Sequence, residues 1–511
     1  MSKQAIKPAV VLVADRTLSA DYKILFEGIF GTMQTTKVPE FMMRRLVAPN
    51  IGTDGDGSAK VVPLGLRKVE TALLKYTSLA SKDVCCTTPE GLPKVLGPWV
   101  KVVGVSSSDP LGNGMSNTTT TSFWEGELYS RYWTRKLLDR IAEAKERYGF
   151  KVVFGGAGAW QWKAYPEERN DCIDVVFDGY FEKQGPGLFE NIINGTDVPD
   201  YVCESGTAAE AICPIENASA LGIVELSRGC GRGCSFCSMA RKPMKHLPIE
   251  KIVADIETNV SAGVRSVVSA SEDFFRYGAE GVKPDFEKLT KLLAEMRRIS
   301  GLSFMQIDHG NIASVLQLSD DELRQVRQLL TWEKKTDYLW VNLGAESASG
   351  SLVAANCRGK IAPFNPDDWE DMIRQAAEKM TQAGFFSVFS LILGLPGETE
   401  ADVTRTLELV KHLEKQDAVI FPIFYEPIRT DEIAAGKRFG LPQMRTSHLE
   451  LYRRCYEINF RRVPLLFWDN QRAGGVSWTK RALMRILGKT EVWAWRKKFN
   501  SIGRDLRSQG R

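Results

Sequence analysis

Short apolar, β-branched runs alternate with amphipathic stretches in two successive series along the chain. The strands predicted in the first series are at residues 9–14, 84–87, 101–106, 151–154 and 173–177, with a helix over residues 127–148. Between the first two runs, Leu66, Val69, Leu73 and Tyr76 recur near helical spacing. This rhythm predicts an α/β fold with a doubly wound parallel sheet, of the flavodoxin or Rossmann kind, over residues 1–200.

A second alternating series begins at Leu221. Its predicted strands are at residues 222–226, 264–270, 304–307, 339–343, 388–393 and 419–424. Six strand–helix units predict a partial (β/α)6 barrel over residues 201–432, in which functional side chains gather at the carboxyl ends of the strands. After residue 432 the pattern becomes helical, and we expect a small basic helical domain at 433–511.

Composition places the chain among ordinary soluble proteins. Of its 511 residues, 43% are hydrophobic and 25% are charged. No apolar stretch approaches the roughly 18 residues of a membrane span, and the first residues carry no signal-peptide cleavage pattern. Ten cysteines over this length are too sparse for a disulfide scaffold. These features together predict a cytoplasmic location.

The net charge of +4 conceals an asymmetry. Residues 451–511 hold 15 Lys and Arg against 4 Asp and Glu, whereas the rest of the chain holds 52 against 59. Such a tail suits contact with an acidic protein, a nucleic acid or a lipid surface. The alternative is a solvated basic helical end with no partner.

Three cysteines follow the first strand of the second series in a CxxxCxxC spacing. Cys230, Cys234 and Cys237 supply three thiolates, whereas a [4Fe–4S] cluster has four irons to ligate. One iron would then be open to a small molecule. The three cysteines are the predicted metal ligands and the predicted catalytic centre.

The cysteine loop has two other interpretations. A zinc site needs a fourth ligand, which His246 could supply, but this cysteine spacing is unusual for zinc. A purely structural role in a core is disfavoured because Gly229, Gly231 and Gly233 make the loop open. The iron–sulfur interpretation is therefore favoured.

Polar residues follow the later strands of the second series. Asp273, Asp308, Glu346 and Glu398 all lie just past predicted strands, as Cys230 does. Because the carboxyl ends of barrel strands meet at one face, we expect these residues to share one site. Candidates for substrate contact are Asp308, His309, Tyr425 and Glu426. His309 suits an acid/base role or a hydrogen-bonded structural one.

In its motifs the second series resembles the radical S-adenosylmethionine (SAM) superfamily. Besides the cysteine loop, Ser-Glu-Asp at 271–273 stands where that family binds the SAM amino group, without its usual Gly-Gly-Glu. Gly-Ala-Glu-Ser at 344–347 resembles the ribose-contacting segment, and Gly-Leu-Pro-Gly-Glu-Thr at 394–399 a further family loop. The resemblance implies a [4Fe–4S] cluster that binds SAM and yields a 5′-deoxyadenosyl radical. The SAM-binding residues it implies are Glu272, Asp273, Glu346, Ser347 and Gly394.

With the first series in front, the architecture resembles cobalamin-dependent members of that superfamily. The resemblance implies a cobalamin held at the ends of the first-series strands, by small residues and their neighbours. The residues concerned are Ser106, Ser107, Ser108, Asp109, Leu111, Gly155 and Gly156. A nucleotide-binding or purely structural sheet is the alternative, since glycine-rich strand ends occur in many such domains.

The histidines bear on how a cobalamin would be held. The chain has four, at 246, 309, 412 and 448, and none lies within residues 1–200. The Asp-x-His-x-x-Gly motif of many cobalamin enzymes is absent. If methylcobalamin binds, its lower face is expected to have no histidine ligand from this domain.

The resemblance implies a methyltransferase that acts on an unactivated sp3 carbon, with one SAM forming the radical and another methylating the cobalamin. Expected partners are an electron donor of the ferredoxin or flavodoxin type and a substrate protein, peptide or lipid, for example a side chain of methyl-coenzyme M reductase. No nucleic acid is expected in this interpretation. The alternatives are a cobalamin-dependent cyclase or rearrangement enzyme, a lipid-modifying methyltransferase, and a non-catalytic iron–sulfur or zinc protein that binds nucleic acid.

Overall fold

The computed structural model of the protein describes residues 6–206, 209–332 and 336–509. The chain divides into two compact units, each built from two segments. The first unit comprises Met1–Val224 and Leu247–Arg265, and the second comprises Glu225–His246 and Ser266–Arg511.

The first unit contains a six-stranded parallel sheet in the order β2-β1-β3-β4-β5-β6. Its strands are β1 (Val10–Ala14), β2 (Val84–Thr87), β3 (Val102–Ser106), β4 (Lys151–Gly155), β5 (Val175–Gly179) and β6 (Tyr201–Glu204). The first five strands are close to those predicted, and the first five positions have the flavodoxin-like order. The sixth strand was not predicted, and it extends this sheet beyond residue 200.

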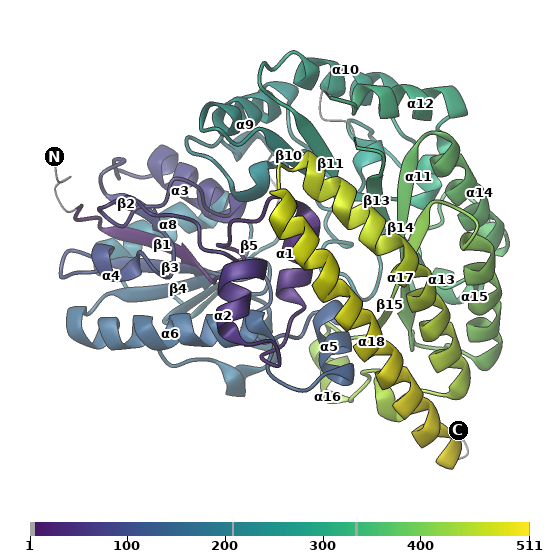
Figure 1. The fold of residues 1–511 in the computed structure, drawn as a ribbon. Coiled ribbons are helices and arrows are strands. Elements are labelled where there is room, and N and C mark those ends of the chain that lie inside the picture. The colour runs from purple at the N-terminus through teal and green to yellow at the C-terminus, as the bar shows by residue number, and fades with distance from the viewer. Residues whose placement is uncertain (1–5, 207–208, 333–335, 510–511) are drawn as a thin grey trace. The chain divides into compact units, whose positions relative to one another are not determined.

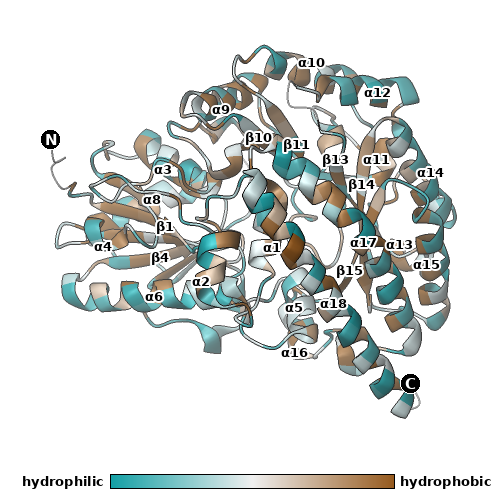
Figure 2. Ribbon diagram, in the orientation of Figure 1, coloured by the Kyte–Doolittle hydropathy of each residue, from teal (hydrophilic) through white to brown (hydrophobic). Residues whose placement is uncertain are grey.

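Helices cover both faces of this sheet (Figure 1). The helices of the first unit are α1 (Leu25–Thr32), α2 (Glu40–Met42), α3 (Leu64–Tyr76), α4 (Leu92–Val95), α5 (Met115–Phe123), α6 (Tyr129–Tyr148), α7 (Gln161–Ala164), α8 (Phe181–Ile193) and α9 (Ile249–Ser261). On one face α3 and α8 pack against Val10, Leu12 and Phe177. On the other, α4 and α6 pack against Val11 and Val103. Burial on both faces explains why the strands are almost continuously apolar (Figure 2).

The order of the first sheet reverses between β1 and β3. From β1 the chain passes outward to β2 on one side, whereas β3 and the later strands lie on the other. At the carboxyl end of this pair Ala14 lies opposite Ser106, and Asp15 N–H donates to the Ser106 carbonyl over 3.2 Å. Parallel sheets of this kind bind ligands at such a switch point.

Helix α9 belongs to the first unit although it follows the cysteine loop in sequence. Buried Lys68 on α3 pairs with Asp255 on α9 over 2.7 Å, and the Ile215 N–H donates to the same carboxylate over 2.7 Å. Asn259, one turn further along α9, accepts the Ser219 N–H over 2.7 Å. Satisfied buried polar groups of this kind fix α9 against the first unit.

The predicted series of parallel strands lies in the second unit, except for Ile223 and Val224 of its first strand, which end the first segment of the first unit. The strands are β7 (Ile223–Glu225), β10 (Ser266–Ala270), β11 (Phe304–Ile307), β12 (His309–Gly310), β13 (Leu339–Glu346), β14 (Phe385–Leu393) and β15 (Ala418–Phe424). They form one sheet in the order β11-β10-β7 and a second in the order β12-β13-β14-β15. Since β11 and β12 are separated by Asp308 alone, the two sheets amount to the predicted partial barrel.

The helices of the second unit cover the outside of these strands and continue to the C-terminus. They are α10 (Phe286–Arg297), α11 (Ile312–Gln317), α12 (Asp320–Leu329), α13 (Gly350–Asn356), α14 (Trp369–Gln382), α15 (Glu400–Leu413), α16 (Thr430–Ala434), α17 (Thr446–Ala473) and α18 (Trp478–Ser508). Capping boxes begin α12 at Ser319 and α15 at Thr399.

Helix α17 packs beside β15, the last strand of its sheet. Buried Asn459 accepts the Ile420 N–H over 2.9 Å and donates to the Ile420 carbonyl over 2.6 Å. A side-chain amide thus takes the place of a neighbouring strand and protects the sheet edge. Among the described residues no helix is both long and apolar enough to cross a membrane.

Candidate cluster and cofactor site

The three predicted ligand cysteines lie on one loop, between the short antiparallel strands β8 (Ser227–Arg228) and β9 (Lys245–His246). Three glycines that alternate with other residues give this loop its shape. Gly229, Gly231 and Gly233 have φ of 73°, 73° and 72°, in the left-handed region that glycine adopts without strain. A Cβ at Gly229 would also lie 2.7 Å from the Lys242 carbonyl, so the loop closes tightly on itself there.

Each of the three thiols has a hydrogen-bond partner within the loop or beside it. Cys230 accepts the Arg232 N–H, and Cys237 accepts the N–H groups of Met239 and Ala240. Cys234 is hydrogen-bonded to the thiol of Cys357. Hydrogen bonds to sulfur stabilise thiolate ligands and tune iron–sulfur clusters. The donor set therefore fits a cluster ligated by three cysteines.

The zinc alternative has less support in the geometry. His246 directs Nε2 to the Ala279 carbonyl at 3.0 Å. Within residues 6–206, 209–332 and 336–509, no three Cys, His, Asp or Glu side chains converge as they would around one metal ion. The thiolates on a [4Fe–4S] cluster bind different irons and need not meet at one point.

Asp273, a predicted SAM-contacting residue, is fully buried and bonded to the cysteine loop. Its Oδ2 pairs with Arg232 over 3.1 Å and accepts the Ser314 hydroxyl over 2.7 Å. The same guanidinium donates to the Gly359 carbonyl over 3.1 Å. Asp273 therefore anchors the loop through Arg232, since a buried carboxylate is stable only when paired.

A second arginine holds the loop from the same segment. Arg276, in the short helical turn after Asp273, donates to the Cys230 carbonyl over 2.6 Å. Burial lowers the pKa of Arg276, and the charge of Asp273 opposes that shift. Two buried guanidinium groups thus lie beside the thiols, where they would offset the negative charge of a bound cluster.

Glu272 lies between the cysteine loop and the end of β11. Burial raises the pKa of Glu272. Burial also raises the pKa of Cys237 to about 11, and the negative charge of Glu272 adds to that shift. On the other side His309 Nδ1 pairs with Asp308 Oδ2 over 2.9 Å. Burial alone would lower the pKa of His309, but the Asp308 carboxylate raises it to about 9. Glu272, Asp308 and His309 form an acid/base group beside the loop.

Glu346, the predicted ribose contact, has an unusual backbone and a buried partner. Its φ is 60°, a left-handed conformation that is strained for glutamate, and it marks a bulge between β13 and β14. Its carboxylate pairs with the ammonium of Lys360, and both side chains are almost completely buried. A Cβ at Gly344 would collide with both charged groups, so the glycine makes room for the pair.

The neighbouring predicted contacts are engaged within the protein. Ser347 Oγ lies 3.2 Å from Thr406 Oγ1 and accepts the Ser349 N–H over 3.2 Å. Gly394 has φ of 80°, and a Cβ there would collide with the ring of Phe439. These residues shape the ends of β13 and β14.

The 394–399 loop is bound to the C-terminal helices rather than to the cysteines. Glu398 Oε2 accepts the Gly394 N–H over 3.1 Å, and its Oε1 lies 2.7 Å from Nε2 of buried His448 on α17. This contact accounts for a glutamate that the sequence placed just past a strand.

In the first unit the predicted cobalamin contacts lie at the switch point. Ser106 pairs with Ala14 on β1 and with Gly155 on β4, so three strand ends meet there. Ser107 Oγ lies 3.2 Å from Thr134 Oγ1 on α6 and also bonds to Asp15. Burial raises the pKa of Asp15, which is wholly enclosed.

Asp109 and Leu111 organise the loop after β3. Asp109 Oδ1 accepts the Asn113 N–H over 2.8 Å and the Gln161 amide over 2.6 Å. Gln161 accepts the Leu111 N–H over 2.9 Å in return. Asn117 donates to Asp109 Oδ2, while its own buried Oδ1 has no partner in the described parts of the chain. That open acceptor fits a polar ligand or water at the loop.

The glycines after β4 pack against this same loop. At Gly156, with φ of 93°, a Cβ would lie 2.6 Å from Ser106 Oγ and 2.7 Å from the Ser107 carbonyl. At Gly158 it would lie 2.7 Å from the Ser108 carbonyl. The space that these glycines provide is taken up by the β3 loop, so they set its position. The cobalamin interpretation therefore rests on the switch point and on the open Asn117 acceptor.

Some residues of the site were not foreseen from the sequence. No sequence motif marks these positions. Lys360 follows a helix, Arg276 lies within a short turn, and Cys357 lies in the interior. Lys360 follows Cys357 in the run Asn-Cys-Arg-Gly-Lys, which carries no local pattern that indicates a contact with the cysteine loop. Most of the cysteines outside the loop are buried.

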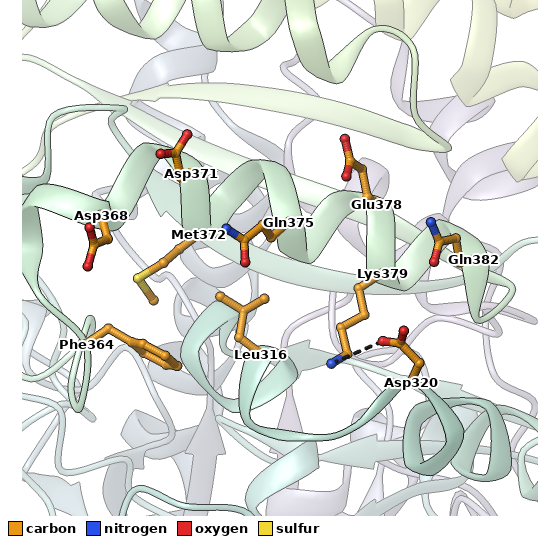
Figure 3. Close-up of a pocket in the computed structure, with 10 residues that line it drawn as sticks. All are labelled: Leu316, Asp320, Phe364, Asp368, Asp371, Met372, Gln375, Glu378, Lys379 and Gln382. Carbon is orange, nitrogen blue, oxygen red and sulfur yellow. Dashed lines mark ion pairs between the residues drawn. The ribbon is translucent and has the colours of Figure 1, made fainter.

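A surface pocket of about 490 Å3 lies elsewhere in the second unit, between α11 and α14 (Figure 3). Leu316, Phe364 and Met372 form its floor, and Lys379 pairs with Asp320 over 3.3 Å at one end. It is lined from helices and loops, and none of the predicted site residues contributes to it.

Comparison with known proteins identifies the second series. Residues 224–410 match the family model of the Radical SAM superfamily. The ribosomal protein uS12 methylthiotransferase RimO of Thermotoga petrophila is 25% identical over 289 residues, 55% of this chain and 62% of that protein. The tRNA-2-methylthio-N(6)-dimethylallyladenosine synthase of Streptomyces griseus is 25% identical over 294 residues, 57% of this chain and 55% of that protein. The chain thus spans less than two thirds of the length of these relatives.

A solved structure shares the fold over a longer stretch. It is the radical SAM methyltransferase TsrM from Kitasatospora setae with cobalamin and a [4Fe–4S] cluster bound, at a TM-score of 0.52 and 14% identity over 82% of this chain and 72% of that chain. A second structure of TsrM, with tryptophan and a SAM analogue, matches at a TM-score of 0.52. Residues 224–410 are thus similar to the Radical SAM superfamily, and the fold of the chain is similar to that of a cobalamin-bound radical SAM methyltransferase.

Proposed function

We propose that the protein is a cobalamin-dependent radical SAM methyltransferase that places a methyl group on an unactivated sp3 carbon. The observation that carries the proposal is the pairing of two features in one chain. One is the cysteine loop with a donor at each thiol, and the other is a flavodoxin-like sheet with polar groups at its switch point. The fold shared with TsrM supports it.

The radical SAM domain implies a [4Fe–4S] cluster and SAM. Such a cluster supplies an electron to SAM, and a bound cobalamin carries a methyl group. In this chain Cys230, Cys234 and Cys237 would hold the cluster. Arg232 and Arg276 fix the loop through Asp273 and the Cys230 carbonyl. These contacts orient the thiols before any cofactor binds.

The SAM contacts are proposed at the carboxyl ends of β10 and β13. Glu272 lies beside Cys237, and Glu346 lies close enough to the cysteines for its charge to act on Cys234. Glu346 is held by Lys360 in the interior. A ligand with a cationic group and hydroxyls, as SAM has, suits a partly buried and a buried carboxylate beside the cysteine loop.

The cobalamin contacts are proposed at the switch point of the first unit. The loop that would receive the cobalamin is positioned by residues at the strand ends, namely Ser106 to Ser108, Asp109, Leu111, Gly155 and Gly156. The lower face of the cobalt would have no histidine from residues 1–200, because that segment contains none.

His309 is proposed as the proton-handling group at the substrate side. It pairs with Asp308, and 42% of its side chain is exposed, so it is accessible to a bound molecule. The Asp308 carboxylate fixes the ring and holds a proton on it at neutral pH. A protonated imidazole can donate a hydrogen bond to a substrate carbonyl or deliver its proton to a basic atom of the substrate.

The substrate is proposed to be a side chain of an acidic protein. Helix α18 carries nine Lys and Arg against two Asp and Glu. Trp478 and Trp493 on the same helix are 65% and 66% exposed. Basic residues interleaved with exposed aromatic side chains suit a macromolecular acidic surface. A ferredoxin- or flavodoxin-type electron donor, also acidic, is a proposed partner for the same reason.

Cofactor loading tests the proposal without knowledge of the substrate. The full chain is reconstituted anaerobically with iron and sulfide, then loaded with reduced cobalamin and SAM that carries a deuterated methyl group. The expected result is a [4Fe–4S] signal in wild-type protein, its loss in Cys230→Ala, and labelled methyl on the bound corrin with release of S-adenosylhomocysteine. Cys455→Ala, a buried cysteine on α17, is the matched control. A chain that binds the cluster but no corrin would contradict the cobalamin part.

Methylthio transfer is a second candidate, because one relative, RimO, is a methylthiotransferase and another is a tRNA-2-methylthio-N(6)-dimethylallyladenosine synthase. The two reactions leave different products: methylation adds CH2 to the mass of the substrate, whereas methylthiolation adds CH2S. Mass spectrometry of proteins from cells with and without the active chain distinguishes them. A product that carries both the deuterated methyl group and sulfur would favour the second candidate.

A further inference from the structure

The segment after α13 is bound to the cysteine loop through its backbone. Cys234 and Cys357 face each other in an isolated antiparallel bridge. On either side of this bridge the Ser235 N–H donates to the Asn356 carbonyl over 2.9 Å, and the Gly359 N–H donates to the Arg232 carbonyl over 2.8 Å. Paired main-chain hydrogen bonds fix the relative position of the two cysteines.

The two thiols meet in the interior. Cys357 is fully buried and Cys234 is 8% exposed. Both are free thiols, and their side chains are hydrogen-bonded to each other. Residues directly opposite in an antiparallel bridge bring their Cβ atoms within about 5.5 Å, which leaves adjacent sulfurs in contact.

The three ligand thiols differ in the kind of donor they have. Cys230 and Cys237 accept main-chain N–H groups. For Cys234 the donor is a side chain that lies more than 120 residues away in sequence, at 357. The antiparallel bridge brings Cys357 opposite Cys234, with both side chains buried.

We propose that Cys357 is a positioning residue whose S–H donates a hydrogen bond to the Cys234 thiolate and thereby raises the reduction potential of the bound cluster. The inference rests on the proposed function, because it requires that these cysteines ligate a [4Fe–4S] cluster. A hydrogen bond to a ligand sulfur stabilises the reduced cluster, which carries more negative charge, over the oxidised one.

Lys360 reinforces this arrangement from the same segment. Its ammonium lies close enough to Cys234 and Cys357 for its charge to act on both thiols, although Glu346 neutralises part of it. The segment from Asn356 to Lys360 thus brings a donor and a cation to the loop, in addition to the Arg276 guanidinium at the Cys230 carbonyl. Both features favour electron gain by the cluster.

A simpler role for Cys357 is to fill space, since buried cysteines often behave as small apolar residues. The two roles predict different results for substitution. If Cys357 only fills space, Ser and Ala variants change stability and leave the potential unaltered. If it donates, the potential depends on whether a donor remains at position 357.

The test is an EPR-monitored redox titration of the anaerobically reconstituted full chain. We expect Cys357→Ala to shift the midpoint potential of the cluster to more negative values, and Cys357→Ser, which retains a donor, to stay near the wild-type value. Cys357→Val keeps the apolar volume without the donor and should shift like Ala, so it serves if Ala does not fold. Cys455→Ala removes a thiol of the same burial on α17 and should leave the potential unchanged.

The outcomes separate the inference from the proposed function. A cluster of unaltered potential in both Ala and Val variants would overturn the inference alone. Equal negative shifts in Ser, Ala and Val variants would also overturn it, because packing rather than donation would then explain the change. A wild-type chain that assembles no cluster would overturn both the inference and the proposed function.

Discussion

The ammonium of Lys360 forms a buried ion pair with the carboxylate of Glu346, the residue whose backbone has a φ of 60°. Burial alone would lower the pKa of Lys360, but the charge of Glu346 raises it. The lysine therefore stays charged, and the strained backbone at the end of β13 is held by an electrostatic contact from the segment that also carries Cys357.

Removal of one member of this pair is expected to destabilise the second unit. Lys360→Met leaves an uncompensated buried carboxylate, and we expect a loss of about 3 kcal/mol in the free energy of unfolding. The double variant Lys360→Met/Glu346→Gln should recover part of this loss, because no unpaired charge remains. Urea unfolding measures both. Lys411→Met, which breaks an exposed pair with Glu408, is the control and should change the value by less than about 1 kcal/mol.

The pH dependence of stability should carry the signature of His309. Its pKa is raised from 6.5 to about 9 in the folded protein, after Asp308 overcomes the effect of burial. A raised pKa means that the protonated form is favoured by folding, so this stabilisation is fully present below about pH 6.5 and is lost as pH rises through 9. Water screens part of the attraction, because 42% of the side chain is exposed.

The difference in melting temperature between wild type and His309→Gln reports this contribution. It should be largest below pH 6.5 and should shrink between pH 7 and 9.5. The same comparison for His412→Gln, at a partly exposed histidine on α15, serves as the control. A difference that grows with rising pH would contradict the assignment of His309 as protonated at neutral pH.

The glycine after β4 should prove essential for the loop at the switch point. Gly156→Ala forces a side chain into a backbone with φ of 93° and places its Cβ 2.7 Å from the Ser107 carbonyl. We expect a loss of about 2 kcal/mol or more in the stability of the first unit, since strain and collision add. Cobalamin affinity should fall as well if the loop receives the corrin.

Gly65→Ala is the matched control for this change. Gly65 lies in α3 of the same unit, and a Cβ there meets nothing within 4 Å. Its stability should be unaltered or slightly raised, because alanine favours helix. Thermal unfolding followed by circular dichroism compares the two variants, and equal stabilities would refute the packing role of Gly156.

Asn459 should contribute to the edge of the barrel sheet. Its amide makes two hydrogen bonds to Ile420 on β15, and Asn459→Ala would leave both main-chain groups buried and unpaired. We expect a loss of about 2 kcal/mol in the free energy of unfolding. Asn500→Ala, at an exposed position of α18, should be neutral. Amide hydrogen exchange at Ile420 should accelerate in the first variant only.

The alternation of apolar runs determined the fold class and most strand positions. Residues 84–87 and 304–307 were predicted as strands with the bounds observed, because a short, mostly apolar run that is buried on both faces has few other structures open to it. β6 (Tyr201–Glu204) was missed, since its residues are only partly buried and the strand depends on pairing with β5. The local pattern of residues indicates which segments are buried, but it does not indicate which edge of the sheet is free to pair with a further strand.

The sequence by itself also determined the cysteine loop, because spacing in a single loop is a local property that needs no long-range contact. What the tertiary structure decided was which distant residues reach that loop. Cys357 opposite Cys234, Lys360 on Glu346 and Arg276 on the Cys230 carbonyl are contacts between segments far apart in sequence. Each depends on strand order and on the path of a connecting loop. No spacing rule relates such residues, so only the folded chain shows that they meet.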